Sequence, residues 1–472
     1  MESMIKAWLV MPILFLSANY LQQCVNGKSQ VPCLFIFGDS LSDSGNNNNL
    51  PTSSKANYNP YGIDFPFGPT GRFTNGRTAI DIITQLLGFE EFIPPFANIN
   101  GSDILKGVNY AAGGAGIRSE TSMTSGFIIS LGMQLKNHRD IVSQIAGKLG
   151  SVDKAQQYLN KCLYYVNIGS NDYINNYYLP QYYPTSLMYS PDQYAEALIQ
   201  ELSLNLLAWL SRFRSRPRVH SQILHQAKFW AKQVIATVFT PQAEEMSPQA
   251  KFLAVYMLSH FAAAKIERKR EKNRVLEGFF IQHQSRIKGG SFWVYSRVGE
   301  VILTPCKHLS LKSLGQGKRF GKRGLHDIGA RKYVLVGLGL LGCVPYTIDN
   351  HGTNGSCVDE ENDPAYIYNA KLKSLVDNFN KKFSLDSKFI FINSTLESDV
   401  QNPDRCFPDE RPCYNRSDYV FWDDAHPTEA WNQLTAIRSY EDTDDSGYTY
   451  PMDIKQLVEQ ETMMKLEPSA SS

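Results

Sequence analysis

The sequence predicts a three-layer α/β/α fold around a central parallel sheet. Short, continuous apolar runs alternate along the chain with longer helical patterns, an order typical of parallel strands joined by crossover helices. The apolar runs show no alternation of polar and apolar residues, as expected for strands that helices cover on both faces. A chain of 472 residues, 43% of them hydrophobic, is long enough for one large domain of this kind.

Five apolar runs are the predicted strands. Each is short and rich in β-branched or aromatic side chains, the composition that strands favour. Four longer segments between them carry helical periodicity. The predicted strands span residues 33–37, 108–111, 163–168, 333–338 and 388–392, and the predicted helices span residues 79–87, 133–149, 191–210 and 363–383.

The N-terminus has the pattern of a secretory signal. Lys6 precedes an apolar run at residues 7–16, which is too short to span a bilayer. We expect residues 1–27 to be a signal peptide, with a buried N-terminal helix as the alternative. No other stretch of the sequence is long and apolar enough for a transmembrane segment. The expected location is therefore extracellular or in the cell wall.

Secretion makes the cysteines candidates for disulfides. Cys33 and Cys162 lie in apolar, strand-like runs and are predicted to be buried thiols. No cysteine has zinc-ligand spacing with histidine, so no metal site is expected. The candidate disulfide loops, each containing proline, are bracketed by Cys343 with Cys357 and by Cys406 with Cys413. Sequons that fit a secreted glycoprotein stand at Asn100, Asn354, Asn393 and Asn415.

Residues 209–324 interrupt the strand–helix order. This segment has 22 Lys and Arg residues, 6 Glu and no Asp, a net charge of +16, so that the rest of the chain has −15. Three interpretations are open: an inserted basic module that binds an acidic partner, a largely disordered insertion, or an artefact of gene prediction. The predicted α/β domain is then discontinuous, formed by residues 30–208 and 325–455, with a C-terminal tail at 456–472.

A serine stands where the first predicted strand ends. The apolar run at 34–37 stops at Gly38-Asp39-Ser40, which indicates a buried strand entering a tight turn with Ser40 at its tip. Open α/β sheets bind their ligands at the carboxyl ends of such strands. Ser40 is therefore a candidate nucleophile, provided that a base lies near it.

The candidate base lies near the C-terminus. Asp423 and His426 are three residues apart, a spacing that lets the carboxylate bind the imidazole Nδ1–H and leaves Nε2 to accept the proton of Ser40. Asp424 is the alternative carboxylate, at a poorer spacing.

Two other strand ends carry candidate oxyanion donors. The glycine-rich loop after residues 108–111 can aim the Gly114 N–H at a substrate, and the Asn171 side chain follows the next strand. Each of these loops is otherwise an ordinary turn. Their common position after a strand favours a shared site at one edge of the sheet.

Together these motifs resemble the GDSL, or SGNH, esterase/lipase family, in its secreted plant branch. The matching blocks are Phe-Gly-Asp-Ser at 37–40, Asn-Tyr-Ala-Ala-Gly-Gly-Ala-Gly at 109–116, Gly-Ser-Asn-Asp at 169–172 and Asp-x-x-His-Pro-Thr-Glu at 423–429. The resemblance implies a flavodoxin-like fold and hydrolysis of carboxyl esters without metal or cofactor. It assigns Ser40 as nucleophile and first oxyanion donor, Gly114 and Asn171 as further donors, His426 as base and Asp423 as its orienter.

Two features depart from the family pattern. Family members usually pass directly from the helix near Leu210 to the strand near Lys332, and they usually have a longer stretch between Ser394 and Cys406. Three functions fit the sequence: an esterase or lipase acting through an acyl-enzyme, a catalytically impaired secreted binding protein, and an acyltransferase. The expected substrate is a small-molecule, cell-wall or lipid ester. We expect a monomer with no nucleic-acid partner.

Overall fold

The chain divides into two compact units in the computed structural model. One unit comprises Met1–Arg212 and Gly321–Ser472, and the other comprises Phe213–Phe320. The predicted signal peptide at 1–27 lies outside the residues that the structure describes, as do Asn100 and Asn354. The described residues are 29–99, 104–207, 281–287, 290–297, 300–305, 325–352, 356–397, 405–406, 411–444 and 446–464.

The first unit is built on a six-stranded sheet with the strand order β2-β1-β3-β7-β8-β9. Neighbouring strands are parallel except at one edge, where β9 pairs antiparallel with β8. All five predicted strands are confirmed, and β9 is an addition. Apart from β9, this is the flavodoxin-like strand order. The strands are β1 Leu34–Gly38, β2 Gly107–Asn109, β3 Leu163–Asn167, β7 Lys332–Val336, β8 Lys388–Ile392 and β9 Thr449–Tyr450.

Both faces of this sheet are buried. On β1, Phe35 and Phe37 belong to one apolar cluster, while Leu34 and Ile36 belong to a second cluster on the opposite face. All four side chains are at most 1% exposed. Because successive side chains of a strand point to opposite faces, a sheet covered on both faces needs continuous apolar runs, as the sequence has.

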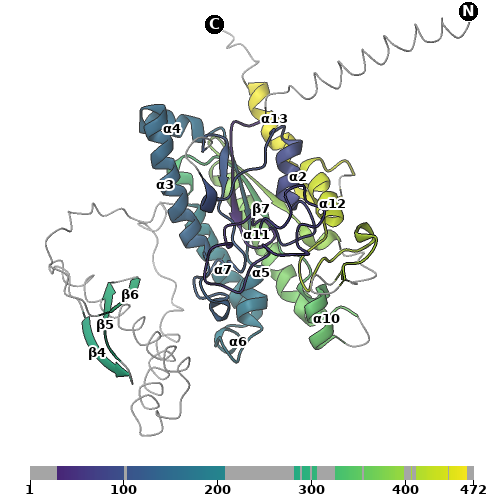
Figure 1. Ribbon diagram of the computed structural model, residues 1–472. Helices are drawn as coiled ribbons and strands as arrows, with labels where there is room; N and C mark the ends of the chain where they lie inside the picture. The colour runs from purple at the N-terminus through teal and green to yellow at the C-terminus, as the bar shows by residue number, and fades with distance from the viewer. Residues whose placement is uncertain are drawn as a thin grey trace, which may run out of the picture. The chain divides into compact units, whose positions relative to one another are not determined.

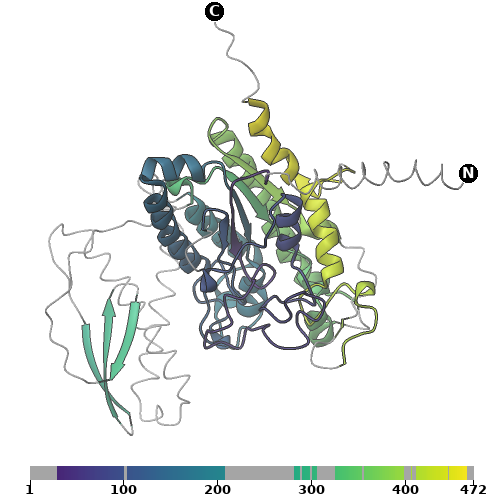
Figure 2. The ribbon, with the colours of Figure 1, turned by 45° about the horizontal axis from the view of Figure 1, so that its top comes forward.

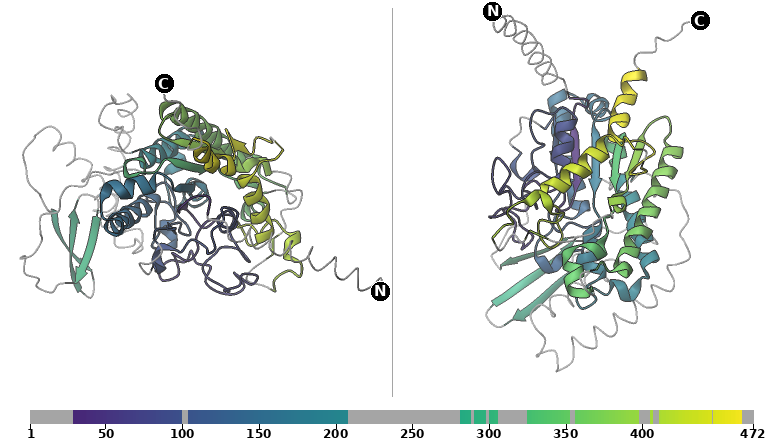
Figure 3. Two further views of the ribbon diagram at one scale, coloured as in Figure 1. Left: turned by 90° about the horizontal axis from the view of Figure 1, so that it is seen from above. Right: turned by 90° about the vertical axis from the view of Figure 1, so that its right-hand side faces the viewer.

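Helices cover the two faces as separate layers, which confirms the three-layer α/β/α fold. Helices α3, α4, α7 and α11 contribute to the cluster around Phe35, and α2, α12 and α13 contribute to the cluster around Leu34. The views in Figures 1 to 3 show the helices on either side of the strands. The helices are α2 Ala79–Leu86, α3 Leu131–Leu149, α4 Val152–Leu159, α5 Ser170–Asp172, α6 Thr185–Met188, α7 Pro191–Leu206, α10 Pro345–His351, α11 Asp359–Lys382, α12 Glu429–Tyr440 and α13 Ile454–Met464.

Local sequence fixes where two of these helices begin. Thr78 and Asp81 form a reciprocal capping box at the start of α2, and Ser190 and Gln193 form another at the start of α7. In each box two backbone N–H groups that the helix leaves without partners gain a side-chain acceptor. Among the described residues, none of the helices is long and apolar enough to cross a bilayer.

The prediction that Cys33 and Cys162 are separate thiols is wrong. The structure joins them in a disulfide, with their Cα atoms 4.7 Å apart. The two cysteines immediately precede Leu34 and Leu163, which are paired neighbours of the parallel strands β1 and β3. Strand pairing therefore places them side by side, although 129 residues separate them in the sequence.

The predicted C-terminal tail also needs correction. Helix α13 runs from Ile454 to Met464, across the boundary predicted at residue 455. Leu457 and Val458 are buried in the cluster around Leu34, so this part of the chain belongs to the domain.

The second unit contains a three-stranded antiparallel sheet. Its strands are β4 Ile281–Ile287, β5 Gly290–Arg297 and β6 Glu300–Pro305, joined in the order β4-β5-β6. The other residues of the insertion predicted at 209–324, which are 209–280, 288–289, 298–299 and 306–324, lie outside the described part of the chain. The three interpretations of this basic segment stay predictions.

Candidate active site

Ser40 follows β1, the second strand of the sheet, which lies between β2 and β3. The chain goes from β1 to β2 on one side of it and then to β3 on the other side. Such a reversal of strand order creates the crevice in which open α/β sheets bind ligands. A close approach of backbone fixes the turn, because a Cβ atom on Gly38 would lie 2.5 Å from the Asn167 carbonyl oxygen. The Gln134 amide donates to the Gly38 carbonyl at 2.7 Å and accepts from its N–H at 3.0 Å.

The structure brings Ser40 together with the predicted base and carboxylate. Ser40 Oγ lies 2.8 Å from His426 Nε2, and His426 Nδ1 lies 2.7 Å from Asp423 Oδ2. The Asp423 carboxylate also accepts the backbone N–H groups of Ala425 and His426, at 2.9 and 2.7 Å. This geometry leaves Nε2 to accept a proton from Ser40, which is the arrangement of a serine nucleophile and its general base.

Backbone contacts hold His426 in a bend before α12. The Trp422 N–H donates to the His426 carbonyl at 2.7 Å, and the Thr428 N–H donates to the Val420 carbonyl at 2.9 Å. Thr428 then caps α12, because its side chain accepts the Trp431 N–H. The imidazole also packs against the Phe73 ring, with 4.9 Å between ring centroids.

Charge pairing shifts the pKa of both dyad members. Burial opposes the charged imidazolium, but the charge and hydrogen bond of Asp423 outweigh it and raise the pKa of His426 above 6.5. Burial would likewise raise the pKa of Asp423, but the charge of His426 and the hydrogen bonds that the carboxylate accepts hold that pKa below 3.8. Asp423 is therefore ionised at any pH at which the His426 imidazole is neutral.

Asp424, the alternative carboxylate, lies elsewhere. Its side chain is 62% exposed and pairs with Arg405 Nη1 at 2.9 Å. Arg405 Nη1 also binds Asp349 of α10 at 2.6 Å. Arg405 thus links the turn that carries His426 to a neighbouring helix.

The predicted oxyanion donors lie on the same cavity as Ser40 and His426. This cavity of about 570 Å³ has Ser40, Gly114, Asn171 and His426 in its wall. Among the described residues, the N–H groups of Ser40 and Gly114 have no hydrogen-bond acceptor. The Asn171 amide donates to the Ala115 carbonyl at 3.1 Å and accepts from Asn175 at 2.7 Å, which fixes its orientation.

Glycine is required at Gly114 by its backbone conformation. Its φ is +77°, and a Cβ atom there would lie 3.0 Å from Ile128 Cδ1 and from Ser54 Oγ. Other residues rarely adopt this left-handed conformation. The rest of the cavity wall is largely apolar, with Tyr58, Leu340 and Tyr346 among its residues.

Comparison with known proteins agrees with this geometry. A model of the GDSL-like lipase/acylhydrolase family matches residues 34–278 and 318–438. The chain belongs to this family. Two GDSL esterase/lipases of Arabidopsis thaliana are 34% and 33% identical to it over 456 and 482 residues, which cover 92% and 97% of this chain and 94% and 100% of theirs. The protein is accordingly a carboxylic ester hydrolase of the GDSL type.

The family match reaches further into the basic segment than the resemblance noted from the motifs. It continues to residue 278 and resumes at residue 318, whereas the motifs suggested a break from 209 to 324. Residues 279–317, which include β4, β5 and β6, remain outside the match.

Two buried carboxylates accept hydrogen bonds from the glycine-rich loop that contains Gly114. Neither of them was predicted from the sequence as a site residue. Asp43 accepts the Gly113 N–H at 3.0 Å, and Asp172 accepts the Ile117 N–H at 2.8 Å. Burial raises the pKa of Asp43 to about 6 and that of Asp172 to about 7. Asp172 lies inside the matched block at 169–172, and Asp43 lies three residues after Ser40. Their place in the sequence beside the predicted site residues was the available signal.

The predicted cysteine pairs are joined, and one of them adjoins the His426 bend. Disulfides link Cys343 to Cys357 and Cys406 to Cys413. The Cys406 N–H donates to the Phe421 carbonyl, so the loop it closes is attached to the segment that leads to Asp423.

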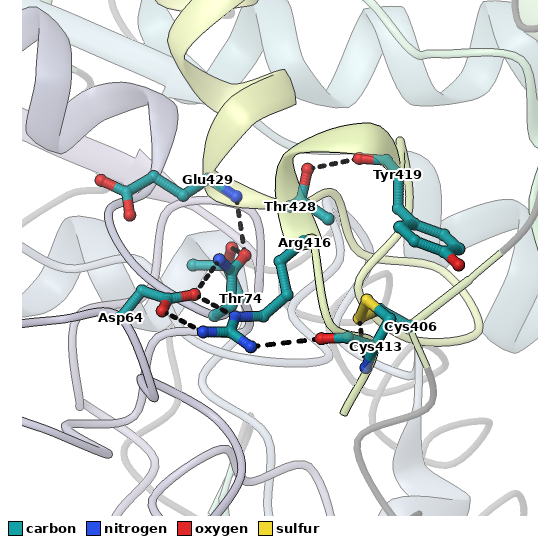
Figure 4. Close-up of a disulfide and its surroundings, with 9 residues drawn as sticks. Asp64, Thr74, Cys406, Cys413, Arg416, Tyr419, Thr428 and Glu429 are labelled. Carbon is teal, nitrogen blue, oxygen red and sulfur yellow. Dashed lines mark hydrogen bonds and ion pairs between the residues drawn. A yellow bond between two sulfur atoms is a disulfide. The ribbon is translucent and has the colours of Figure 1, made fainter. Parts of the chain in front are cut away.

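Figure 4 shows how this disulfide loop is bound to the chain that follows β1. The Arg416 guanidinium donates two hydrogen bonds of 2.6 Å to the Asp64 carboxylate, and a third of 3.2 Å to the Cys413 carbonyl. The Glu429 N–H also donates to Asn75 at 2.8 Å. The N-terminal and C-terminal parts of the domain are therefore joined beside the dyad.

Two of the four predicted sequons are described. Asn415 is exposed. Asn393 is half-buried, and its amide oxygen accepts from the Thr395 hydroxyl at 2.7 Å.

Proposed function

We propose that this chain is a secreted serine hydrolase that cleaves carboxyl esters through an acyl-enzyme on Ser40. The observation that supports this most directly is a chain of two hydrogen bonds. Ser40 Oγ lies 2.8 Å from His426 Nε2, and His426 Nδ1 lies 2.7 Å from Asp423 Oδ2. Ser40 lies in the wall of the cavity. A reacting ester can therefore meet a nucleophile whose proton already has an acceptor.

The first half-reaction transfers the acyl group to the enzyme. His426 Nε2 takes the Ser40 proton while Oγ forms a bond to the ester carbonyl carbon, and the carbonyl π electrons move to the oxygen. The Ser40 and Gly114 N–H groups and the Asn171 amide are the proposed donors to this oxyanion. When the carbonyl reforms, the bond to the alkoxy group breaks and His426 protonates the departing alcohol.

The second half-reaction restores the enzyme. His426 removes a proton from water, whose oxygen attacks the acyl carbon and forms the same kind of oxyanion. Collapse of that intermediate releases the carboxylic acid, and Ser40 recovers its proton from His426. Throughout, the ionised Asp423 stabilises the imidazolium and keeps its Nδ1–H in place.

The cavity supports a small-molecule ester as the substrate. Its volume of about 570 Å³ falls in the range of pockets that enclose ligands of drug size. The largely apolar wall offers a surface for an acyl or alkyl group.

Secretion is supported by the cysteines of the first unit. Among the described residues, three disulfides join Cys33 to Cys162, Cys343 to Cys357 and Cys406 to Cys413. Such bonds persist in oxidising compartments and are rare in the cytosol. The exposed Asn415 sequon and the N-terminal signal pattern agree with that location.

The deciding experiment compares the wild type with Ser40→Ala, using a p-nitrophenyl ester and a fluorophosphonate probe. The wild type should turn over the ester and take up one probe on Ser40. The variant should do neither, while keeping the wild-type circular dichroism spectrum.

The alternatives give different results in the same experiment. A folded wild type that neither hydrolyses nor labels would identify a binding protein on this scaffold and overturn the proposal. Undiminished hydrolysis by Ser40→Ala would also overturn it. Ester product that forms from an added alcohol faster than acid forms from water would identify an acyltransferase.

A further inference from the structure

The Asp423 carboxylate has a side-chain partner besides His426. The Tyr61 hydroxyl donates to Asp423 Oδ2 at 2.7 Å, the oxygen that also lies 2.7 Å from His426 Nδ1. Tyr61 is 6% exposed and Asp423 is 7% exposed. A charge-assisted bond between two buried groups is among the stronger hydrogen bonds that a protein makes.

Three contacts fix the Tyr61 ring in this place. It packs edge-on against Tyr58, Phe73 and Trp422, with ring centroids 5.2, 6.1 and 6.4 Å away. Trp422 directly precedes Asp423, and Phe73 packs on the His426 imidazole. The phenol therefore lies within the aromatic packing that surrounds the dyad.

The backbone beside Tyr61 is also fixed. The Gly62 N–H donates to the Thr74 carbonyl at 3.0 Å. Gly62 has φ +68°, and a Cβ atom there would lie 2.2 Å from the Gly68 carbonyl oxygen. The Asp64–Arg416 pair in Figure 4 binds this same loop to the disulfide loop near the dyad.

We propose that Tyr61 is a positioning residue for catalysis, which holds the Asp423 carboxylate in the orientation that presents it to His426 Nδ1. This inference rests on the proposed role of Asp423 and His426. Backbone N–H groups fix Oδ1, and Tyr61 fixes Oδ2, so the carboxylate cannot rotate away from the imidazole.

The Tyr61 bond also moderates the charge of the carboxylate. Its donated proton draws negative charge away from Asp423 and weakens the attraction that Asp423 exerts on the imidazolium. Two further carboxylates, Asp39 and Asp424, also raise the pKa of His426. With no change in those two, loss of the Tyr61 hydroxyl should raise the pKa of His426.

The test is Tyr61→Phe, which removes the hydroxyl and keeps the ring. We expect kcat to fall about tenfold, the scale of one charge-assisted hydrogen bond, with KM within twofold of the wild type. The acid limb of the kcat/KM profile for a p-nitrophenyl ester should move to higher pH.

Tyr333→Phe is the matched control. It deletes a fully buried hydroxyl that donates to the Ala330 carbonyl at 2.8 Å, at a residue outside the cavity wall. It should change thermal stability but leave kcat and the acid limb unchanged.

Two results would count against this assignment in different ways. If the wild type shows Ser40-dependent turnover and Tyr61→Phe keeps the wild-type kcat and pH profile, Tyr61 has a packing role alone and the inference is wrong. If the wild type has no Ser40-dependent turnover, the proposed function fails, and the inference fails with it.

Discussion

Asp423 binds His426 at two points, because its carboxylate lies 2.7 Å from the imidazole Nδ1 and accepts the His426 backbone N–H, also at 2.7 Å. The backbone bond fixes the carboxylate relative to the chain, and the imidazole bond fixes the ring relative to the carboxylate. This double contact follows directly from the three-residue spacing seen in the sequence.

The first prediction concerns Asp423→Asn. The asparagine oxygen can keep the backbone N–H groups, but its amide N–H₂ then faces Nδ1 and favours the tautomer with the proton on Nε2. That tautomer cannot accept the Ser40 proton, so kcat should fall roughly 10³- to 10⁴-fold. Steady-state hydrolysis of a p-nitrophenyl ester measures the loss.

Asp424→Asn is the control for that variant. Asp424 is exposed and pairs with Arg405, so its loss should change kcat by less than about threefold, as for most surface pairs. If Asp424→Asn were the more damaging of the two, Asp424 rather than Asp423 would be the orienter.

The sequence predicted those site residues whose contacts are local in the chain or lie at the ends of parallel strands. Ser40, Gly114 and Asn171 each follow a parallel strand, so their meeting at one sheet edge follows from the fold class. The contact between Asp423 and His426 could be predicted from their three-residue spacing alone. These are the contacts that periodicity and motif order can encode.

Contacts that depend on strand order or on irregular loops were not predictable in the same way. Cys33 and Cys162 meet because β1 and β3 are neighbours in the sheet. The sequence of a single strand does not indicate which other strands will pair with it. Tyr61 contacts Asp423, which is 362 residues away in the sequence. Tyr61 lies in a segment without helix or strand, where no periodicity predicts the direction in which a side chain points.

The second prediction concerns the pH dependence of the wild type. His426 must be neutral to accept the Ser40 proton, and Asp423 raises the pKa of His426 above 6.5. Activity should therefore rise with pH as the imidazolium loses its proton, with a midpoint above 6.5. A kcat/KM profile for a p-nitrophenyl ester between about pH 5 and pH 9 measures this limb; a midpoint below 6.5 would contradict the assigned charge pairing.

The third prediction concerns the oxyanion donors, through Asn171→Ala. The Asn171 amide is the one proposed side-chain donor, and removal of one such donor typically lowers kcat about 10²- to 10³-fold. Because the oxyanion exists only in the tetrahedral state, KM should stay within about threefold of the wild type.

Asn175→Ala separates donation by Asn171 from its orientation. Asn175 donates to Asn171 Oδ1 at 2.7 Å and also borders the cavity, but it is not a proposed oxyanion donor. Its loss frees the Asn171 amide to rotate without deleting it, so kcat should fall less than in Asn171→Ala. Equal losses of kcat in the two variants would mean that Asn171 acts through the packing of this wall, and Ser40 and Gly114 would then remain as the oxyanion donors.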